Sequence, residues 1–548
     1  MKNLLLFLLL SASALFAQNV ITVTDADITG SSGTVNWTKN NIYLLDGYVY
    51  VESPTILNIE AGTVIKAKEA PTTGDVASVL VITRGAKINA VGTAQEPIIF
   101  TTEYDDTNLP DNGTDPGVDY RIDRGLWGGV VLLGKAVLNV AFEKVVEGLP
   151  ATDDRAKYGG SDDADNSGVF KYVSIRYTGI TVEANKELQG LTLGCVGSNT
   201  VVEYVESFNS SDDGFEFFGG TVNTKYLISA FADDDAFDYD QGFRGFHQFW
   251  FAIQGDSVGD HLGEFDSGDS GALTNEPLSK PVIYNATFIG RGANATGGDI
   301  ALMYKEYGGG EIYNSIITDF DKSGVKVDSG SGLTCYNRFV DGQLILQNNI
   351  WYKNSSSTVN DIAGQFFMQQ FLGNPANANT LINPQLYSIA RSGNNLLDAR
   401  PMQSSPAFTL PRKQLPAGNN FFTSADFYGA FGANNWAAGW TNLNSIGLLT
   451  GVKKADESNT PSEYSLGQNY PNPFNPSTKI NFSIPEAGNV RLVVYNILGQ
   501  QVAELVNGFK NIGAYEINWD ASKFTSGVYL YKLETSAGSF TKKMSLTK

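Results

Sequence analysis

Short alternations of apolar and polar residues run along the chain from Ile21 to about Thr441, and Gly, Asn and Asp interrupt them at close intervals. A period of two residues is typical of β-strands with one buried face. The region shows no sustained 3.6-residue period of the kind that indicates an amphipathic helix. The pattern therefore predicts an all-β region built from many short strands.

Two internal repeats give this region a fixed period. The apolar pattern of Leu57–Ile65 recurs at Leu80–Ile88, an offset of 23 residues, and Ser211–Gly220 recurs at Asp233–Gly242, an offset of 22. A repeat of this length is about one rung of a parallel β-helix, whose rungs stack ~4.8 Å apart. A pair of β-sandwiches, the competing fold, would show turn signals every ~8–12 residues. The predicted fold class is an all-β, right-handed parallel β-helix.

The 22-residue offset also predicts which side chains face the core. It places Val205, Leu227 and Phe249 in one inward column. Two columns of acidic residues have the opposite parity and are expected to point outward. These columns are Asp212, Asp234 and Asp256, and Glu216, Asp238 and Asp260.

A group of aromatic residues beside His247 has two interpretations, a platform on which a sugar stacks and the filling of a wide core. Core filling is favoured, because Phe249 and Phe251 share the inward parity. The group consists of Phe246, Phe249, Trp250 and Phe251.

Charge narrows the possible partners. The 548 residues include 38 Lys and Arg against 58 Asp and Glu, which gives a formal net charge of −20. Such a surface repels phosphate backbones, so nucleic acid is not an expected partner. With 2 His in the whole chain, neither a His-rich zinc site nor a Ser–His–Asp triad is predicted.

The N-terminus has the plan of a secretory signal peptide over residues 1–17. Lys2 is followed by an apolar run from Leu4 to Leu10 and by small residues that lead to Ala17. The run is shorter than the ~20 residues that span a bilayer, and no later stretch reaches that length. We expect a mature protein that starts at Gln18, passes through the periplasm and is not transmembrane.

The composition changes towards the C-terminus. Residues 449–463 are predicted to link a β-helix domain at 18–448 to a smaller domain at 464–548. The smaller domain has 8 Lys and Arg and 5 Asp and Glu, net +3, which leaves −23 for the rest. Its alternating runs, separated mostly by Gly or Pro, predict a small antiparallel sandwich. The runs are Lys479–Ile484, Val490–Tyr495, Tyr515–Trp519, Val528–Leu533 and Phe540–Leu546.

An acidic segment carries the candidate chemistry. Residues 201–270 contain 15 Asp and Glu, against which stand only Lys225 and Arg244, a local net charge of −13. In the predicted register, carboxylates ~4.8 Å apart would repel by roughly 3 kcal/mol at an effective dielectric of 20. Something must offset this repulsion.

Three interpretations of the acidic segment are open. The acids cap backbone N–H groups in solvated turns, or bind a hard cation such as calcium, or act as catalytic carboxylates like those of polysaccharide-cleaving β-helix enzymes. We find no complete motif of such enzymes. The candidate calcium ligands are Asp212, Asp213, Asp234, Asp235 and Asp238.

Three stretches of the long region resemble a family of secreted bacterial β-helix proteins. They are Gly85–Thr101 (GAKINAVGTAQEPIIFT), Gly125–Gly134 (GLWGGVVLLG) and Glu187–Gly220. The segment Gly429–Leu443 resembles the end of the same domain, and between about Asn354 and Arg412 the repeat gives way to an insertion or a cap. The resemblance implies the architecture and no particular activity.

The tail closely resembles the type A C-terminal sorting domain of the type IX secretion system, an Ig-like module of Bacteroidota. The matching positions include Pro471, Asn472, Pro473, Phe474, Gly499, Gly527 and Lys543. The resemblance implies recognition by the type IX machinery and export across the outer membrane. It also implies removal of the tail, with the cargo released or linked to surface lipopolysaccharide.

Together these features predict a secreted cell-surface protein whose β-helix is a binding, adhesive or structural surface. Lipopolysaccharide and extracellular polysaccharide are the expected surface partners. The alternative is a polysaccharide lyase or glycoside hydrolase on the same scaffold, because fold alone does not decide function. The sequence leaves open whether the protein is an enzyme.

Overall fold

The computed structural model describes residues 18–107, 117–183, 186–268, 273–293, 295, 300–354, 357–393, 396–449, 464–485, 488–510, 513–535 and 537–547. The predicted signal peptide and nearly all of the predicted linker lie outside these residues. The chain divides into two compact units, Met1–Val452 and Lys453–Lys548. Within the described residues, no helix has the length and apolar character needed to cross a membrane.

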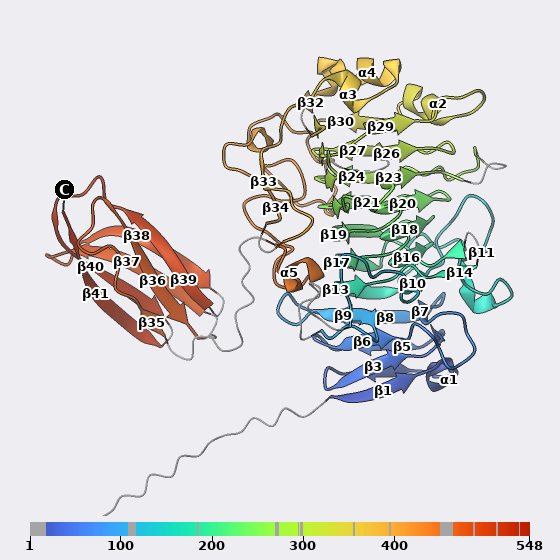
Figure 1. Cartoon of the computed structure of the whole chain (residues 1–548), viewed down its shortest axis with the longest axis horizontal. Helices are drawn as coiled ribbons and strands as arrows, with labels where there is room; N and C mark the ends of the chain where they lie inside the picture. Colours follow the sequence, from blue (N-terminus) through green and yellow to red (C-terminus); the bar gives the residue numbers. More distant parts are fainter. Residues whose placement is uncertain are drawn as a thin grey trace, which may run out of the picture. The chain divides into compact units, whose positions relative to one another are not determined.

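The first unit is a parallel β-helix, seen in Figure 1 as a stack of short strands. One face is a parallel sheet of nine strands in rung order. It consists of β4 (Tyr48–Val51), β7 (Val79–Ile82), β10 (Val130–Leu133), β16 (Leu191–Gly194), β18 (Phe215–Phe218), β20 (Phe237–Asp240), β23 (His261–Phe265), β26 (Ile300–Tyr304) and β29 (Ser323–Val327).

A second sheet of 19 strands wraps the rest of the stack in two parallel columns. The first column is β2 (Thr34–Trp37), β5 (Ile56–Ile59), β8 (Lys87–Val91), β13 (Gly168–Arg176), β17 (Val201–Phe208), β19 (Asn223–Ala230), β21 (Phe246–Gln248), β24 (Val282–Tyr284), β27 (Gly310–Tyr313) and β30 (Leu344–Gln347). The second is β1 (Asn19–Val23), β3 (Asn41–Leu45), β6 (Val64–Ala67), β9 (Ile98–Thr102), the later halves of β13, β17 and β19, then β22 (Phe251–Ile253), β25 (Thr287–Ile289), β28 (Ile316–Thr318), β31 (Ile350–Tyr352) and β32 (Thr380–Leu381).

The strands β13, β17 and β19 belong to both columns because each bends at one residue. The bends lie at Tyr172, Tyr204 and Tyr226, whose φ angles are 52°, 55° and 59°. A residue with a positive φ, in the left-handed region, turns the chain direction sharply within the strand. The three rings stack with centroids 4.3 and 4.2 Å apart, so the corner itself forms a ladder.

The predicted 22-residue register is confirmed between two pairs of strands and changes in the next rung. Val205 pairs with Leu227, and Phe215 pairs with Phe237. In the following rung Ile228 pairs with Phe251, an offset of 23. The prediction for Phe249 was therefore wrong.

Phe249 does not lie in the inward column. It stacks on Tyr226 outside the core, with ring centroids 4.9 Å apart. Trp250 takes the inward position instead, 4.3 Å from the ring centroid of Phe237. One added residue in this rung exchanges the two faces, since side chains alternate with a period of two.

The acidic columns shift in the same way. Asp238 pairs with Glu264, an offset of 26, and not with Asp260 as predicted. The backbone N–H of Asp260 donates to the carbonyl of Asp234, so Asp260 occupies the position that was predicted for Asp256. The offset increases from 22 to 26 residues because the turn before β23 contains additional residues.

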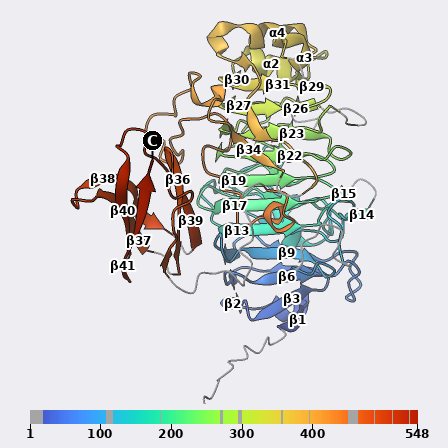
Figure 2. The same cartoon turned by 60° about the vertical axis from the view of Figure 1, so that its left-hand side comes forward.

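The last rung is capped, and the chain then returns along the stack. Ile362, Met368 and Leu372 of the cap are at most 1% exposed and close the end of the core. The cap contains α3 (Val359–Ile362) and α4 (Phe366–Gly373), which follow α2 (Cys335–Val340). Residues 382–449 then run back along the outside, past β33 (Leu386–Ser388) and β34 (Asp398–Pro401), to α5 (Asn442–Ser445) (Figure 1, Figure 2).

Smaller elements complete the first unit. They are α1 (Asp25–Ile28), the hairpin strands β11 (Lys144–Val145), β12 (Lys157–Tyr158), β14 (Thr181–Glu183) and β15 (Lys186–Glu187), and three short 3-10 helices, η1 (Asp154–Ala156), η2 (Pro375–Asn377) and η3 (Pro406–Phe408). The two hairpins lie between β10 and β16, one before and one after β13, and their apolar residues cover part of the outer face of the nine-stranded sheet.

The second unit is an antiparallel sandwich, as expected for an Ig-like module. Its sheets are β35 (Ser465–Leu466), β36 (Ser477–Ile484) and β39 (Gly513–Asp520), and β37 (Gly488–Asn496), β38 (Gln501–Lys510), β40 (Gly527–Thr535) and β41 (Gly538–Leu546). The unit has a hydrophobic core of its own, which includes Phe474, Leu492 and Tyr531.

Candidate functional site

The candidate site lies where three rungs stack, on the outer side of β18, β20 and β23. The alternation in β18 sends Phe215 and Phe217 into the core and Glu216 outward. Glu216 is nevertheless only 6% exposed. Three aligned columns of polar residues result, each with one member in each rung. The columns are Asp212, Asp234 and Asp260; Asp213, Asp235 and His261; and Glu216, Asp238 and Glu264.

Hydrogen bonds between rungs hold the middle column. Asp235 donates its backbone N–H to Oδ1 of Asp213, at 2.9 Å, and His261 donates its own to Oδ1 of Asp235, at 2.6 Å. The bonds fit the interpretation in which Asp caps backbone groups. They do not account for the other carboxylates, so capping explains only part of the site.

The structure brings all five predicted calcium ligands into three close groups. In each group, ligand atoms lie within 4.8 Å of one another. The groups are Asp212, Asp213 and Asp234; Asp213, Glu216 and Asp238; and Asp235, His261 and Glu264. We call these eight residues the acidic cluster. Glu216, His261 and Glu264 are members that were not among the predicted calcium ligands.

Several carboxylates of the acidic cluster are buried, contrary to what solvated turns would show. Asp213 is 7% exposed and Asp235 is 4% exposed. Oε2 of Glu216 and Oδ1 of Asp238 are buried and accept no hydrogen bond from the residues that the structure describes. An ionised carboxylate in that position is costly unless a cation or a proton neutralises it.

Burial is the main cause of the raised pKa values of several carboxyl groups in the acidic cluster, and neighbouring carboxylates add to it. The pKa of Asp212 is raised to about 8 and that of Asp235 to about 7. Three more carboxyl groups have pKa values well above the ordinary range, those of Asp213, Glu216 and Asp238. At neutral pH the site therefore favours bound protons or a bound cation.

The two histidines have opposite environments. Burial lowers the pKa of His261, but its bond to Asp235 and the carboxylates around it outweigh burial and raise the pKa above its ordinary value. His247 lies in the aromatic core, where burial lowers its pKa to about 3. His247 thus packs as a neutral ring, and His261 belongs to the site.

A cavity of about 550 Å³ opens elsewhere on the β-helix. Its lining includes Phe246, Arg244 and Lys280. The side chain of Phe246 is 37% exposed. Within the aromatic group of the sequence, Phe246 is thus the exposed member, since Phe249, Trp250 and Phe251 are buried. The lining of this cavity includes no member of the acidic cluster, so acids and cleft do not converge there.

Four of the sorting-signal residues form one loop of the second unit. The loop Pro471–Phe474 lies against the C-terminal strand β41, where Phe474 donates its N–H to the Ser545 carbonyl, at 3.0 Å. The side chain of Asn472 accepts from the N–H of Ser545, at 2.9 Å. Phe474 is 1% exposed, so the motif helps to close the core.

The other sorting-signal positions are spread over the second unit. Gly499 closes the turn between β37 and β38 with φ of 78°, a conformation that favours glycine. Gly527 begins β40, and Lys543 is an exposed residue of β41.

Comparisons with known proteins give two family matches. Residues 28–381 match a model described as a pectate-lyase-like beta helix domain, and residues 468–547 match a secretion system C-terminal sorting domain. Among solved structures, tailspike protein 2 of an Escherichia coli O157:H7 bacteriophage aligns at 9% identity with a TM-score of 0.16, over 92% of this chain and 64% of the tailspike chain. No curated protein matches the sequence significantly.

Proposed function

The chain belongs to the pectate-lyase-like β-helix family and ends in a type IX sorting domain, and from this premise we propose that its β-helix is a calcium-stabilised binding, adhesive or structural surface. The sorting domain makes it a secreted protein that interacts with the type IX machinery. The expected surface partners are lipopolysaccharide and extracellular polysaccharide.

The observation that carries the calcium proposal is the group formed by Asp213, Glu216 and Asp238. Its ligand oxygens lie within 4.8 Å of one another, and two of its buried oxygens have no hydrogen-bond partner among the described residues. Calcium binds 6–8 oxygens at about 2.3–2.6 Å, so oxygens on opposite sides of the ion lie about 5 Å apart. The spacing suits an ion between the three side chains.

The second oxygen group extends the site towards the turns. Asp213 belongs to both groups, and Asp212 and Asp234 complete the second one. Adjacent rungs supply these oxygens from a rigid stack, so little ordering is needed when the ion binds. The proposed ion offsets the electrostatic repulsion between the carboxylates that the stacked rungs bring together.

Calcium titration of the metal-free protein tests this proposal. Because the ion binds only the folded state, a hundredfold excess over the dissociation constant should stabilise the fold by about 2.7 kcal/mol, which raises the melting temperature. Asp234→Asn combined with Asp238→Asn should abolish the calcium response. The matched control, Glu96→Gln with Asp154→Asn, removes two exposed charges that belong to none of the three ligand groups and should keep the response.

The absence of any calcium response in the wild type would contradict the proposal and favour protonated, capped carboxylates. A response that survives the double substitution would move the ion to another part of the chain.

The family match supports a second candidate, cleavage of a polysaccharide by the same acidic face. An enzyme of this type needs carboxylates that reach substrate, whereas Asp213 and Glu216 are buried. A polysaccharide panel assayed for reducing ends and for unsaturated uronates tests it. This candidate gains only if Asp234→Asn with Asp238→Asn folds normally and loses an activity that the wild type has.

A further inference from the structure

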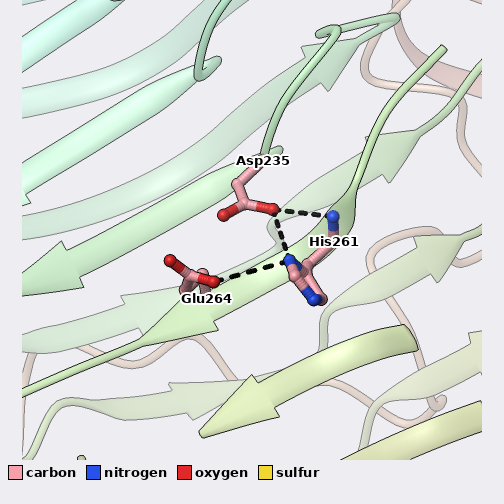
Figure 3. Close-up of side chains that lie close together, drawn as sticks. All are labelled: Asp235, His261 and Glu264. Atoms are coloured by element: carbon pink, nitrogen blue, oxygen red, sulfur yellow. Dashed lines mark hydrogen bonds and ion pairs between the residues drawn. The ribbon is translucent and has the colours of Figure 1, made fainter. Parts of the chain in front are cut away.

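We propose that Asp235, His261 and Glu264 form a second metal site, which takes a borderline transition ion of the Zn²⁺ class. Figure 3 shows the three side chains directed towards one another. The inference rests on the proposed function in one respect, because Asp235 is also a predicted calcium ligand.

The distances around Nδ1 of His261 match a coordination sphere. Nδ1 lies 2.9 Å from Oδ1 of Asp235, 3.6 Å from Oε2 of Glu264 and 3.7 Å from Oδ2 of Asp260. Ligands bound to a tetrahedral zinc ion at about 2.0–2.2 Å lie roughly 3.3–3.6 Å from each other. The contact with Glu264 falls in this range, and the shorter contact with Asp235, which is a hydrogen bond, would lengthen when an ion replaced the shared proton.

A hydrogen bond from the ring accounts for only one of these three contacts. Nδ1 carries at most one hydrogen, and Asp235 accepts it at hydrogen-bond distance. The oxygens of Glu264 and Asp260 lie beyond that distance, yet they face the same nitrogen. His261 is 8% exposed, and the side chains of Asp235 and Glu264 are 6% and 15% exposed, so water does not freely screen these two carboxylates, whereas Asp260 is exposed. One shared ion would satisfy all of them.

Neighbouring groups orient the ligands. Lys305 pairs with Oε1 of Glu264, which leaves Oε2 facing the imidazole. The backbone N–H of His261 fixes Oδ1 of Asp235. Bonds of this kind, one step away from a metal, hold its ligands in place.

The donor set separates this site from the calcium ligands. Imidazole nitrogen suits zinc and similar ions, whereas an all-oxygen group suits calcium. The groups of Asp212 and of Glu216 contain carboxylates alone, and only the third group contains a nitrogen donor. The acidic cluster would then sort two cations by ligand chemistry.

The test is a Zn²⁺ titration by calorimetry at neutral pH, with the mature chain prepared without a histidine tag and kept in excess Ca²⁺. Co²⁺ as a second probe should give the visible absorption of a low-symmetry site. We expect one Zn²⁺ per chain. The chain suits this measurement, because its other histidine, His247, and both cysteines, Cys195 and Cys335, are fully buried.

His261→Gln should weaken Zn²⁺ binding by more than about tenfold, because even residues one step from a metal contribute roughly 10–100-fold. The matched control is Asp256→Asn, an exposed acid in the preceding turn, which should bind Zn²⁺ as the wild type does. An unchanged calcium response in His261→Gln would show that the variant is folded.

Equal Zn²⁺ affinity of wild type and His261→Gln, or no Zn²⁺ binding to the wild type, would overturn the inference. The two proposals fail separately. A calcium response without Zn²⁺ binding would contradict the Zn²⁺ site and leave the calcium proposal standing. Zn²⁺ binding through His261 without a calcium response would contradict the calcium proposal and leave the Zn²⁺ site standing.

Discussion

The carboxylate of Glu206, on β17, lies 2.5 Å from the backbone nitrogen of Asn442, which is 236 residues later in the chain. The same carboxylate accepts the N–H of Leu443, at 3.2 Å, and the hydroxyl of Ser174, at 2.6 Å. Glu206 is fully buried, and the contact ties the start of α5 to the outer face of the β-helix. It marks the place where the returning segment 382–449 is fastened to the stack.

Glu206→Ala should loosen this segment. The substitution leaves two buried backbone N–H groups without their acceptor, at a cost of about 1–3 kcal/mol for each unsatisfied group. We expect a lower melting temperature and faster hydrogen exchange over residues 430–449. Glu203→Ala, on the same strand but in a partly exposed ion pair with Lys171, is the control and should change neither by much. Unaltered exchange in Glu206→Ala would show that apolar packing alone holds the segment.

Stability of the metal-free protein should fall as the pH rises from about 4 to about 9. The carboxyl groups of Asp212 and Asp235 have pKa values raised to about 8 and about 7 in the fold, so the folded state keeps protons that the unfolded chain releases above about pH 4. His261 acts in the same direction, because its raised pKa gives stability that is lost as the pH passes that value.

Thermal melts in a chelator from pH 5 to about pH 8.5 measure this trend. Glu216→Gln should flatten the curve, since it removes one of the buried acids whose proton is lost. Added calcium should also flatten it, because the ion replaces the protons. A melting temperature that rises over this range would contradict the burial of these groups.

The β-helix could be predicted from the chain because a rung length of 22 residues is visible as a repeat; the 23-residue repeat does not mark a rung, since Leu57 pairs with Ile88 and not with Leu80. Val205 with Leu227 and Phe215 with Phe237 follow the 22-residue offset, and both pairs lie in the core. The register failed at Phe249, where the rung is one residue longer. Turns of a β-helix absorb insertions on the outside without disturbing the stacked strands, so the offset cannot be extended from one rung to the next.

The acidic cluster was only partly predictable for the same reason. Asp213 and Asp235 stand in repeated sequence, and their proximity follows from the repeat. His261 and Glu264 follow an offset of 26, which no repeated letters reveal. The hairpins between β10 and β16 cover the outer face of the sheet that carries Glu216, and they come from a distant part of the sequence. Local alternation says only that Glu216 points outward.

The tail was predicted from its motifs, but the structural role of those motifs was not visible in the sequence. Phe474 looks like one more residue of a Pro-rich loop, yet it pairs with the last strand through backbone bonds to Ser545 and Thr547. Contacts between residues about 70 positions apart leave no local pattern. The strand β38, Gln501–Lys510, was also missed, because its residues alternate weakly.

Removal of residues 464–548 should leave a folded β-helix that stays in the periplasm. The two units have separate hydrophobic cores, so the first does not need the second to fold. The expected result is a normal melting profile for the truncated protein, together with protection from protease added to intact cells.

Phe474→Ala tests the same export step with a single substitution. Loss of a buried Phe side chain costs about 3–5 kcal/mol and should unfold the small sandwich. Asn507→Ala, an exposed position in the same unit, is the control and should reach the surface. Normal surface display of the truncated chain would show that export does not depend on the sorting domain.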